Sequence, residues 1–317
     1  MPGMDSQGKS KSAYTGGRFT LELDQKKAVG FVTSIDGGHF KADGVKSEVG
    51  VDQMTGHFAG RPKYEDITLT CGMAMSASFW KWVQATLDGK PERRSGALVG
   101  YDFNNKERSR RSFYDALIAE IGFPALDGAA KSSALMTIKI SPERIDHKAG
   151  DGSNLQYSQS QNELSKQKRW LTNNFTFSLD HVIVGETRNL KIEAFTVKQN
   201  VITNPVGNDR IARKEAGRVE LPNLQVSFPE IHMADWWKWY DESVVKGNPQ
   251  DTTGHLTYFA SDGQGSSRTE LMRIDLDGVG LTSLEVEKYE AQKEAIARVK
   301  ANLYIEGFKL NPGHGTA

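Results

Sequence analysis

The chain has 317 residues, and its 40 acidic and 40 basic residues give a formal net charge of zero. This balance excludes a general electrostatic attraction to nucleic acid or to an anionic membrane surface. A single cysteine excludes an intrachain disulfide bond and a thiolate-rich metal site, and no apolar run approaches the ~20 residues that cross a bilayer. Residues 1–17 are rich in Ser, Gly and Lys, so we expect a flexible arm there, without a secretory signal peptide.

The arm contains a pattern that is typical of phosphate-binding loops. Residues 3–10 read G-M-D-S-Q-G-K-S and fit G-x-x-x-x-G-K-[ST]. A working loop follows a buried strand and opens a helix whose N-terminus faces the phosphates, and the sequence predicts neither element here. The seven histidines lack H-x-x-x-H spacing, and the chain has no G-x-S-x-G. We therefore expect no cofactor, no metal site and no catalytic residue.

Alternating apolar and polar residues predict a series of short β-strands after the arm. Residues 18–24 read R-F-T-L-E-L-D, and residues 30–43 form a second strand. A polar loop with glycines follows at residues 44–60, and residues 67–70 read I-T-L-T and form a third strand. Beyond the helix described next, we expect strands at residues 97–103, 112–121 and 135–140.

Residues 76–89 read S-A-S-F-W-K-W-V-Q-A-T-L-D-G and predict an amphipathic helix. Large aromatic side chains are usually buried, so we expect the apolar stripe of this helix to pack in a core. Ser78 is the expected N-cap, and Gly89 is the expected left-handed residue after the last turn. The stripe consists of Phe79, Trp82, Val83 and Leu87.

A second segment, residues 235–247, repeats this helix. It reads D-W-W-K-W-Y-D-E-S-V-V-K-G, and Trp237 lies 157 residues after Trp80. Asp235 is its expected N-cap, and Gly247 is the expected left-handed residue at its end. The corresponding core stripe consists of Trp236, Trp239, Tyr240 and Val244.

The strands repeat at nearly the same distance as the helix. Residues 174–180 read N-F-T-F-S-L-D and match the first strand, and a second polar loop lies at residues 199–217. The offsets between matching residues stay at 155–158 and reach 165 at the last strand. A period this long predicts two copies of one fold unit, because solenoid repeats have ~20–50 residues. The other expected strands of the second copy are residues 190–198, 224–227, 256–260, 269–275 and 295–305.

The repeat predicts the domain organisation and the fold class. Each copy combines several short β-segments with one strong helix. This pattern predicts a mainly β protein made of two tandem antiparallel β-sandwich or barrel domains, with one α-helix per repeat. The expected parts are a flexible arm at residues 1–17, a first domain at 18–140, a polar linker at 141–173 and a second domain at 174–310.

The first copy resembles the tail tube proteins of contractile phages and phage-like injection systems, and more distantly the type VI secretion tube protein. The resemblance covers residues 18–140 well. It covers residues 174–309 more weakly, because residues 217–223 read G-R-V-E-L-P-N where the first copy has G-R-P-K-Y. The matching features are G-R-P-K-Y at residues 60–64, I-T-L at 67–69, the helix with Trp80 and Trp82, and L-D-G at 87–89.

The resemblance implies a structural protein without enzymatic activity, in which the edge strands of neighbouring subunits pair into rings that stack into a hollow tube. Family units have about half the length of this chain and form hexameric rings. Two fused copies would therefore close as a trimer with pseudo-sixfold symmetry, and a hexamer of the whole chain is the alternative. The implied partners are sheath and baseplate proteins, with DNA or an effector passing through the lumen without sequence-specific binding. The resemblance also implies assembly in the cytoplasm into a virion tail or a phage-like particle, with no membrane partner.

Charged side chains in the two polar loops are candidate contacts between subunits or rings, although ordinary solvated loop charges give the same pattern. They are Lys41, Asp43, Lys46, Glu48, Lys198, Arg210, Arg213 and Lys214. A basic cluster at residues 106–111, K-E-R-S-R-R, fits either a phosphate contact or a turn that faces solvent or a neighbouring subunit.

Two other functions remain open at this point. A tube-initiating or hub-adaptor ring, which joins a trimeric spike to a sixfold tube, also suits a fused pair of domains. A hydrolase or carbohydrate-binding β-sandwich would need a cleft with perturbed carboxylates or an aromatic platform. The sequence shows no residue spacing that predicts such a cleft.

Overall fold

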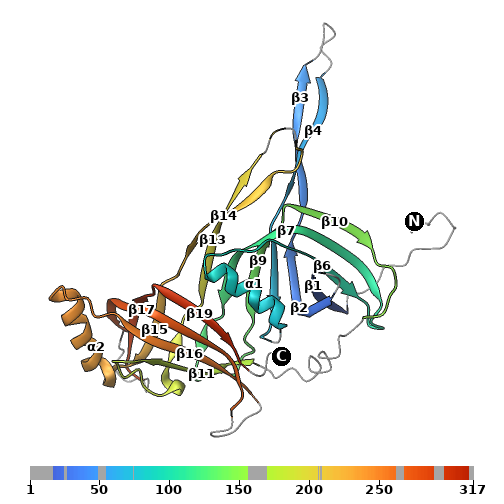
Figure 1. Cartoon of the computed structure of the whole chain (residues 1–317). Coiled ribbons are helices and arrows are strands. Elements are labelled where there is room, and N and C mark those ends of the chain that lie inside the picture. The colour runs from blue at the N-terminus through green and yellow to red at the C-terminus, as the bar shows by residue number, and fades with distance from the viewer. Residues whose placement is uncertain are drawn as a thin grey trace.

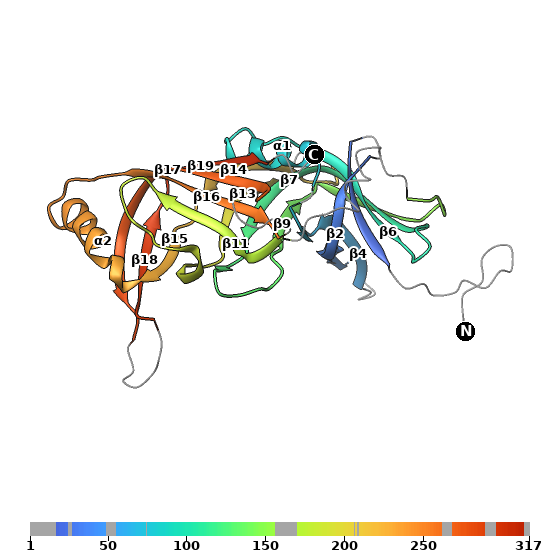
Figure 2. The ribbon, with the colours of Figure 1, turned by 90° about the horizontal axis from the view of Figure 1, so that it is seen from below.

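The computed structural model describes residues 17–24, 27–48, 55–73, 75–155, 170–205, 207, 209–261, 268–288 and 296–313. Within these residues the chain is mainly β, with two barrel-like antiparallel sheets and one α-helix against each (Figure 1). Seen from below, the two sheets lie side by side in an elongated molecule (Figure 2). The predicted fold class is therefore confirmed. The phosphate-loop pattern at residues 3–10 lies outside the described residues, as does all but the last residue of the expected arm.

The first sheet is a closed antiparallel barrel. Its strands follow the order β7-β6-β1-β2-β5-β9, and β9 pairs back with β7. β10 continues along β7 beyond β9. The strands are β1 (Arg18–Leu23), β2 (Lys27–Gly37), β5 (Ile67–Cys71), β6 (Arg94–Tyr101), β7 (Glu107–Phe123), β9 (Met136–Ser141) and β10 (Arg144–Ala149).

The alternation in β5 shows how these strands build a core. Ile67, Leu69 and Cys71 point inward and are at most 2% exposed, whereas the two threonines between them are partly exposed. Burying one such aliphatic side chain contributes about 1.5–3 kcal/mol relative to leaving it in water. Period-2 sequences with one apolar face therefore form strands with one face in the barrel interior.

The second sheet has the same design. Its strands follow the order β11-β16-β17-β18-β15-β12, and β19 pairs with β17. A short 3₁₀ turn, η3 (Thr187–Asn189), precedes β12. The strands are β11 (Trp170–Leu179), β12 (Lys191–Ile192), β15 (Leu224–Pro229), β16 (Thr252–Ala260), β17 (Glu270–Val286), β18 (Arg298–Tyr304) and β19 (Gly307–Pro312).

The two barrels are copies in register. Ile118 of β7 lies opposite Ile140 of β9, and Leu281 of β17 lies opposite Leu303 of β18. Leu281 lies 163 residues after Ile118, and Leu303 lies 163 residues after Ile140. A one-residue slip would turn every core side chain outward, so this shared register makes residue-by-residue comparison of the barrels meaningful.

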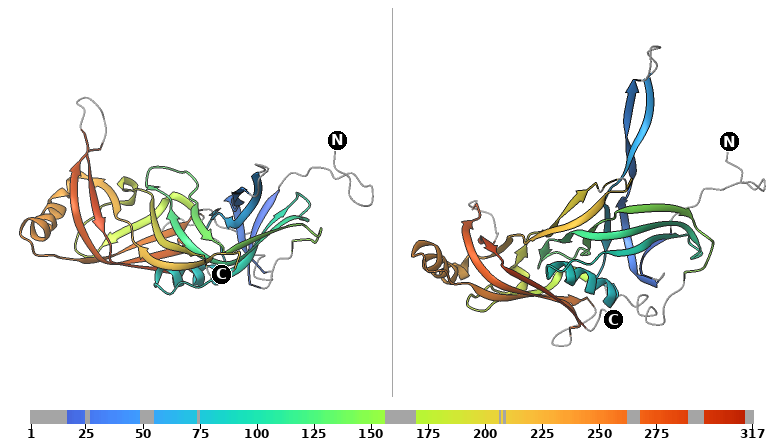
Figure 3. Two further views of the ribbon diagram at one scale, coloured as in Figure 1. Left: turned by 90° about the horizontal axis from the view of Figure 1, so that it is seen from above. Right: turned by 45° about the horizontal axis from the view of Figure 1, so that its top comes forward.

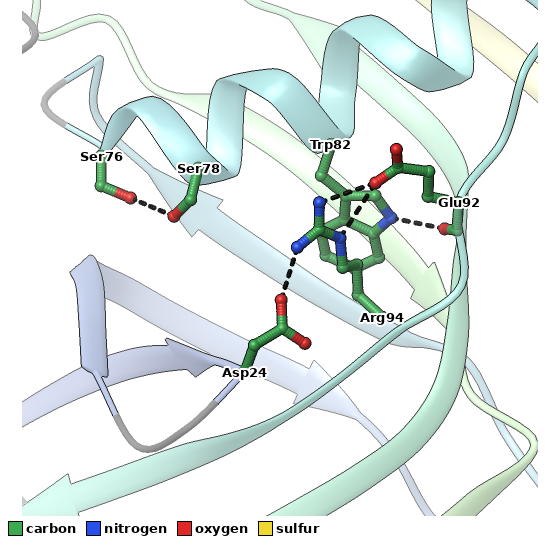
Figure 4. A network of polar contacts seen from close by, with 6 residues as sticks. All are labelled: Asp24, Ser76, Ser78, Trp82, Glu92 and Arg94. Atoms are coloured by element: carbon green, nitrogen blue, oxygen red, sulfur yellow. Dashed lines mark hydrogen bonds and ion pairs between the residues drawn. The ribbon is translucent and has the colours of Figure 1, made fainter.

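Each barrel is covered by one helix, α1 (Ala77–Leu87) or α2 (Met233–Tyr240). The indole of Trp82 donates a hydrogen bond to the backbone oxygen of Glu92 at 2.8 Å, and the equivalent Trp239 donates one to Gln250 at 2.7 Å. Figure 4 shows the first of these bonds beside Arg94, which forms ion pairs with Glu92 and Asp24. The residues of the two predicted stripes that face the cores are Phe79, Trp82 and Val83, with Leu87 partly buried, and Trp236 and Trp239, with Tyr240 partly buried.

The helix ends differ from the expectation at their starts. Ser76, and not Ser78, is the N-cap of α1, and the two serine hydroxyls are 2.8 Å apart. A 3₁₀ turn, η4 (Glu230–His232), leads into α2, so Asp235 lies in the first turn, where a negative charge suits the helix dipole. Gly89 and Gly247 have φ angles of +69° and +72°, as the left-handed position requires.

Val244 is 44% exposed rather than buried in the core. The cause lies in the helix itself, because α2 continues as a wider π-helical segment, η5 (Asp241–Val245). The extra residue per turn rotates Val244 away from the stripe that Trp236 and Trp239 define.

The two segments expected as polar loops are β-hairpins. They consist of β3 (Phe40–Glu48) with β4 (Thr55–Tyr64), and β13 (Phe195–Asn204) with β14 (Arg213–Glu220). The expected strand at residues 30–43 divides at Gly37 and Gly38, whose φ angles are +80° and +71°. The parts expected as loops, residues 44–60 and 199–217, are mostly polar and lack sustained apolar alternation, so their strands left no periodic signal in the sequence.

The range expected as a linker contains the strand β10, which pairs with β7 of the first barrel. Its sequence, R-I-D-H-K-A, has one buried apolar side chain, Ile145, and therefore gives little periodic signal. Strands also cross the expected domain boundary. β13 pairs with β7 of the first barrel, and the short strand β8 (Leu126–Asp127) pairs with β12 of the second sheet.

Candidate assembly surfaces

The junction between the two barrels is a strand exchange. β13 of the second half adds to the first sheet beside the C-terminal end of β7. The yellow hairpin β13–β14 can be followed in Figure 1 from the second barrel to β7. The opposed residues are Phe195 with Phe123, Thr196 with Gly122, Val197 with Ile121, and Lys198 with Glu120. One copy of the fold therefore completes the sheet of the other through backbone pairing.

An aromatic cluster packs against this pairing. The rings of Phe123 and Phe195 stack with centroids 4.7 Å apart, and Phe308 of β19 lies 5.6 Å and 6.1 Å from them. Phe123 is 2% exposed and Phe195 is 4% exposed. An aromatic pair of this kind contributes about 0.5–1.5 kcal/mol beyond the area that it buries. The cluster therefore stabilises the junction between the barrels.

A second contact joins α1 to the second barrel. The backbone N–H of Leu310 in β19 donates a hydrogen bond to Oε1 of Gln84 at 2.9 Å, and α1 packs along β19. Trp80 lies outside the predicted core stripe of its helix, but it is only 2% exposed. In Figure 1, α1 lies between the two barrels, whereas α2 lies at the outer end of the second.

The hairpin β13–β14 is anchored by a buried lysine. Nζ of Lys214 donates to Oγ of Ser141 at 2.8 Å and lies 3.3 Å from Oδ1 of Asp66, and the Lys214 N–H donates to Glu143 at 2.8 Å. Lys214 is 8% exposed. Lys214, which we expected at an interface, therefore uses its charge inside the single chain, where burial without partners would be costly.

Arg210 also makes a contact inside the chain. Its guanidinium donates to the backbone oxygen of Gly60 at 3.1 Å, and Arg61 donates in return to the backbone oxygen of Gly207 at 2.8 Å. These two hydrogen bonds join strand β4 of the hairpin β3–β4 to the segment between β13 and β14. The remaining expected contact residues with described side chains, Lys41, Asp43, Lys46, Lys198 and Arg213, are exposed, and the Glu48 side chain lies outside what the structure describes.

The hairpin β3–β4 has no sheet neighbour among the described residues. It projects from the first barrel as a two-stranded arm, seen in blue at the top of the right panel of Figure 3. Phe40 at its base is 65% exposed, and Val45 further along is 49% exposed. The pKa of Lys41 is raised above its usual value by a hydrogen bond from its ammonium to Glu65 and by the charge of that carboxylate. Isolated two-stranded hairpins are marginal in water, so a projecting one with exposed apolar residues is a candidate interaction surface.

Two arginines of the basic cluster at residues 106–111, Arg108 and Arg110, pair with nearby carboxylates. Arg110 lies 2.7 Å from both Glu22 and Glu107, which are largely buried. These two partners raise the pKa of Arg110 above its usual value, and the largest cause is the hydrogen bonding that Arg110 donates to Glu107. Arg108 pairs with Asp102 at 2.8 Å. The arrangement fits the interpretation of the cluster as a structural turn.

The described residues were also compared with the requirements of a metal site, a reactive thiol and a membrane-spanning helix. In that part, no group of three or more His, Cys, Asp or Glu side chains is placed to hold a metal ion. Burial raises the pKa of the Cys71 thiol to about 12, so this thiol is a poor nucleophile. None of the described helices combines the length and the apolar character that crossing a bilayer requires.

One protein family model matches the part of the chain that forms the first barrel. Residues 16–146 match the family model described as T4-like virus tail tube protein gp19. No curated protein matches the chain.

Three solved structures are similar to about half of the chain. A chain of the anti-feeding prophage baseplate, solved with 6-fold symmetry, has 8% identity and a TM-score of 0.33, and the match covers 44% of this chain and 91% of that one. A chain of the sheath-tube complex of the extracellular contractile injection system PVC, in its extended state, has 14% identity and a TM-score of 0.37, with 50% and 99% covered. A chain of the anti-feeding prophage tube terminating cap has 16% identity and a TM-score of 0.36, with 51% and 96% covered.

Proposed function

We propose, because residues 16–146 match the family model of the T4-like virus tail tube protein gp19, that the whole chain is a structural subunit of the inner tube of a contractile phage tail or a phage-like injection system. It associates with further copies of itself into rings, and the rings stack. The mechanism is mechanical and involves no catalytic residue. The stacked rings form a stiff tube that is held inside a sheath and driven outward when the sheath contracts.

The strand exchange inside the chain carries the proposal. Strand β13 of the hairpin β13–β14, which comes from the second half of the chain, pairs with β7 of the first barrel. The equivalent hairpin of the first half, β3–β4, pairs with no other strand among the described residues. The pairing of β13 with β7 is a head-to-tail contact, and such contacts generate closed rings when the rotation between units closes. Two barrels per chain make three chains the smallest closed set with six barrels. The proposed ring is therefore a trimer with pseudo-sixfold symmetry.

The proposed partners follow from this role. Sheath proteins contact the outside of the ring stack, and baseplate proteins contact its end. DNA or an effector protein passes through the central hole, and the balanced charge of the chain favours passage without sequence-specific binding. The proposed site of assembly is the cytoplasm, and the product is part of a virion tail or a phage-like particle.

Native mass spectrometry and negative-stain microscopy of the purified chain test the proposal. The expected result is a ring of three chains that shows six similar lobes around a hole, together with rods at higher protein concentration. Six chains per ring would contradict the trimer. A chain that remains monomeric at all concentrations and forms no rods in the presence of its sheath would contradict the tube function itself.

The outer parts of the hairpins are the proposed contacts between rings. Lys46 and Arg213 are exposed and lie on the segments of β3 and β14 that extend beyond the barrels. We expect Lys46→Glu combined with Arg213→Glu to shorten rods in electron micrographs by about twofold or more without changing the ring mass. Rods of unchanged length would exclude these charges as stacking contacts. Lys214 is unsuitable for this test, because its ammonium is buried within the chain.

A tube-initiating or hub-adaptor ring is the second candidate function. The fusion of two barrels in one chain favours it, because a three-chain ring has the symmetry of a trimeric spike on one side and of a sixfold tube on the other. The number of copies per particle separates the two functions. Quantitative mass spectrometry that finds a single ring per particle would support the adaptor, and many rings would support the tube.

A further inference from the structure

The internal junction buries residues whose counterparts at the outer ends of the molecule are exposed. Phe123 of β7 is 2% exposed, and Val286, at the same position of β17, is 47% exposed. Phe195 of β13 is 4% exposed, and Phe40, at the same position of β3, is 65% exposed. Phe40 and Val286 belong to different halves of the chain, and both are exposed in the single chain.

The end of β17 also has an unused edge. Ser283 to Val286 pair with β18 on one side, and no strand among the described residues pairs with their other side. At the same position of the first barrel, the end of β7 pairs with β9 on one side and with β13 on the other. An unpaired edge with an exposed apolar side chain is a template for another strand.

The helices show the same difference independently. Trp80 is 2% exposed on a helix, α1, that packs along β19, and its counterpart Trp237 is 52% exposed. Trp237 stacks on Tyr240 with ring centroids 5.6 Å apart, which leaves an aromatic pair on the outer surface of α2. The residue that covers α1 also has a counterpart. Leu310 of β19 is 4% exposed, and the equivalent His147 of β10 is exposed.

We propose that the outer end of the second barrel receives the first barrel of a second copy of this chain, in the geometry of the internal junction. Hairpin β3–β4 of one copy pairs with the unused edge of β17 in the other, while β10 of the first copy covers the aromatic pair on α2. The inference rests on the proposed ring and specifies its joint. The register places Phe40 opposite Val286, Lys41 opposite Glu285, Ala42 opposite Leu284 and Asp43 opposite Ser283.

The charges at this joint agree with the register. Lys41 is exposed and meets the exposed Glu285 as a cross-strand pair of opposite charge, which favours this pairing over a shift that would bring like charges together. The two apolar residues Phe40 and Val286 meet where Phe195 and Phe123 stack in the internal junction. The contact between Phe40 and Val286 removes apolar surface from water, which drives association.

The two surfaces of the joint are far apart in one chain. The hairpin β3–β4 projects from the first barrel, and α2 lies at the opposite end of the molecule (Figures 1 and 3). The hairpin β3–β4 and the outer end of the second barrel can therefore be covered only by binding to other copies of the chain. Each added copy presents the same pair of surfaces again, so association continues until the ring closes.

A pair of cysteine variants tests the register. Asp43→Cys with Ser283→Cys places the thiols across the proposed joint, and Lys198→Cys with Glu120→Cys places them at the matched position of the internal junction, where the residues are opposed in the structure. After mild oxidation with copper phenanthroline, the first pair is expected to yield a covalent product that ends at three chains on a non-reducing denaturing gel. The matched control is expected to yield a bond within single chains.

The outcomes separate this inference from the proposed function. Intact rings without covalent bonds in the first pair, while the control bonds form, would overturn the joint and leave the tube function standing. Absence of rings under all conditions would instead refute the tube function. If both cysteine pairs fail to form bonds, assembly of the Lys41→Glu variant decides the question, since unchanged ring formation would overturn the register and restored formation with Lys41→Glu plus Glu285→Lys would support it.

A variant of α2 tests the second contact. Trp237→Ala removes an exposed ring, so we expect an unchanged melting temperature of the single chain and ring association that is weaker by about tenfold in mass photometry. The control is Phe103→Ala, which removes an aromatic side chain that is 76% exposed in the turn between β6 and β7, outside both surfaces. Equal association of the Trp237→Ala variant and the control would overturn the role of α2.

Discussion

The first and second barrels hold the same strands in the same register, but equivalent residues differ in exposure wherever the first barrel touches the second. Trp80 and Trp237 belong to the same W-K-W sequence, and they are 2% and 52% exposed. Phe195 and Phe40 begin equivalent hairpins, and they are 4% and 65% exposed. The difference comes from the neighbour and not from the local sequence, since the first member of each pair has a neighbouring barrel and the second has none in a single chain.

An exposed aromatic residue has more significance when its counterpart in a duplicated domain is buried. A single exposed apolar side chain on a protein surface needs no explanation. Here two strands and one helix carry such residues at positions that are buried in the duplicated copy of the same fold. If the chain assembles as proposed, the internal junction is the reference for how the outer surfaces pack.

The first prediction tests whether the exposure of the two tryptophans reflects their energetic roles. In the single chain, Trp80→Ala should lower the free energy of unfolding by about 3–5 kcal/mol, because it removes a large buried side chain and leaves a cavity. Trp237→Ala should change it by at most about 0.5 kcal/mol, as surface substitutions usually do. Urea denaturation followed by circular dichroism measures both. Similar losses in the two variants would mean that α2 is packed in solution in a way that the structure lacks.

The second prediction compares an equivalent pair of arginines. Arg110 holds the buried carboxylates of Glu22 and Glu107, so Arg110→Met should cost roughly 3–5 kcal/mol by leaving these charges without a partner. The equivalent Arg273 pairs with the partly exposed Asp275 at 2.7 Å, and Arg273→Met should cost at most about 1 kcal/mol. The same denaturation experiment checks the ratio, and a larger loss at Arg273 would contradict the expected order.

The helices and the core strands could be predicted from the sequence because their signals are periodic and local. Phe79, Trp82 and Val83 lie on one stripe, and that stripe faces the barrel of the same repeat. Trp80 lies off the stripe, and no rule based on one helix predicts its burial, because the covering strand β19 comes from the other barrel. The one feature of the sequence that singled out Trp80 was that a tryptophan, Trp237, occupies the equivalent position of the second copy.

The hairpins and part of the assembly surface could not be predicted for a related reason. Residues 44–60 and 199–217, which form the larger part of these hairpins, are mostly polar, so their sequence is typical of loops. Their strand structure depends on backbone pairing within each hairpin, and β13 also pairs with the edge of a neighbouring sheet. Among the charged candidates, Lys214 has the same residue type as its exposed neighbours, yet tertiary structure buries it beside Ser141 and Asp66. Sequence alone carries no information that separates it from Arg213.

The third prediction concerns acid stability and has the smallest expected effect. Partial burial acts to raise the pKa of Asp275, but the hydrogen bond and charge of Arg273, together with Asn311 and His255, lower the pKa below its usual value. A carboxylate with a depressed pKa in the folded state stabilises that state above its unfolded pKa of about 3.9 and loses this contribution as the pH falls through the folded pKa.

Asp275→Asn should therefore lower the free energy of unfolding by less than about 1 kcal/mol at neutral pH, because the group is partly exposed to solvent. The difference from the unchanged chain should stay constant down to about pH 5 and shrink below about pH 4. Ser112 occupies the equivalent position in the first barrel, beside the buried Arg110 cluster, and Ser112→Ala serves as the control without a titrating group. A difference for Asp275→Asn that grows as the pH falls would show that the pKa of Asp275 is raised, and the carboxylate would then differ from the paired one seen beside Arg273.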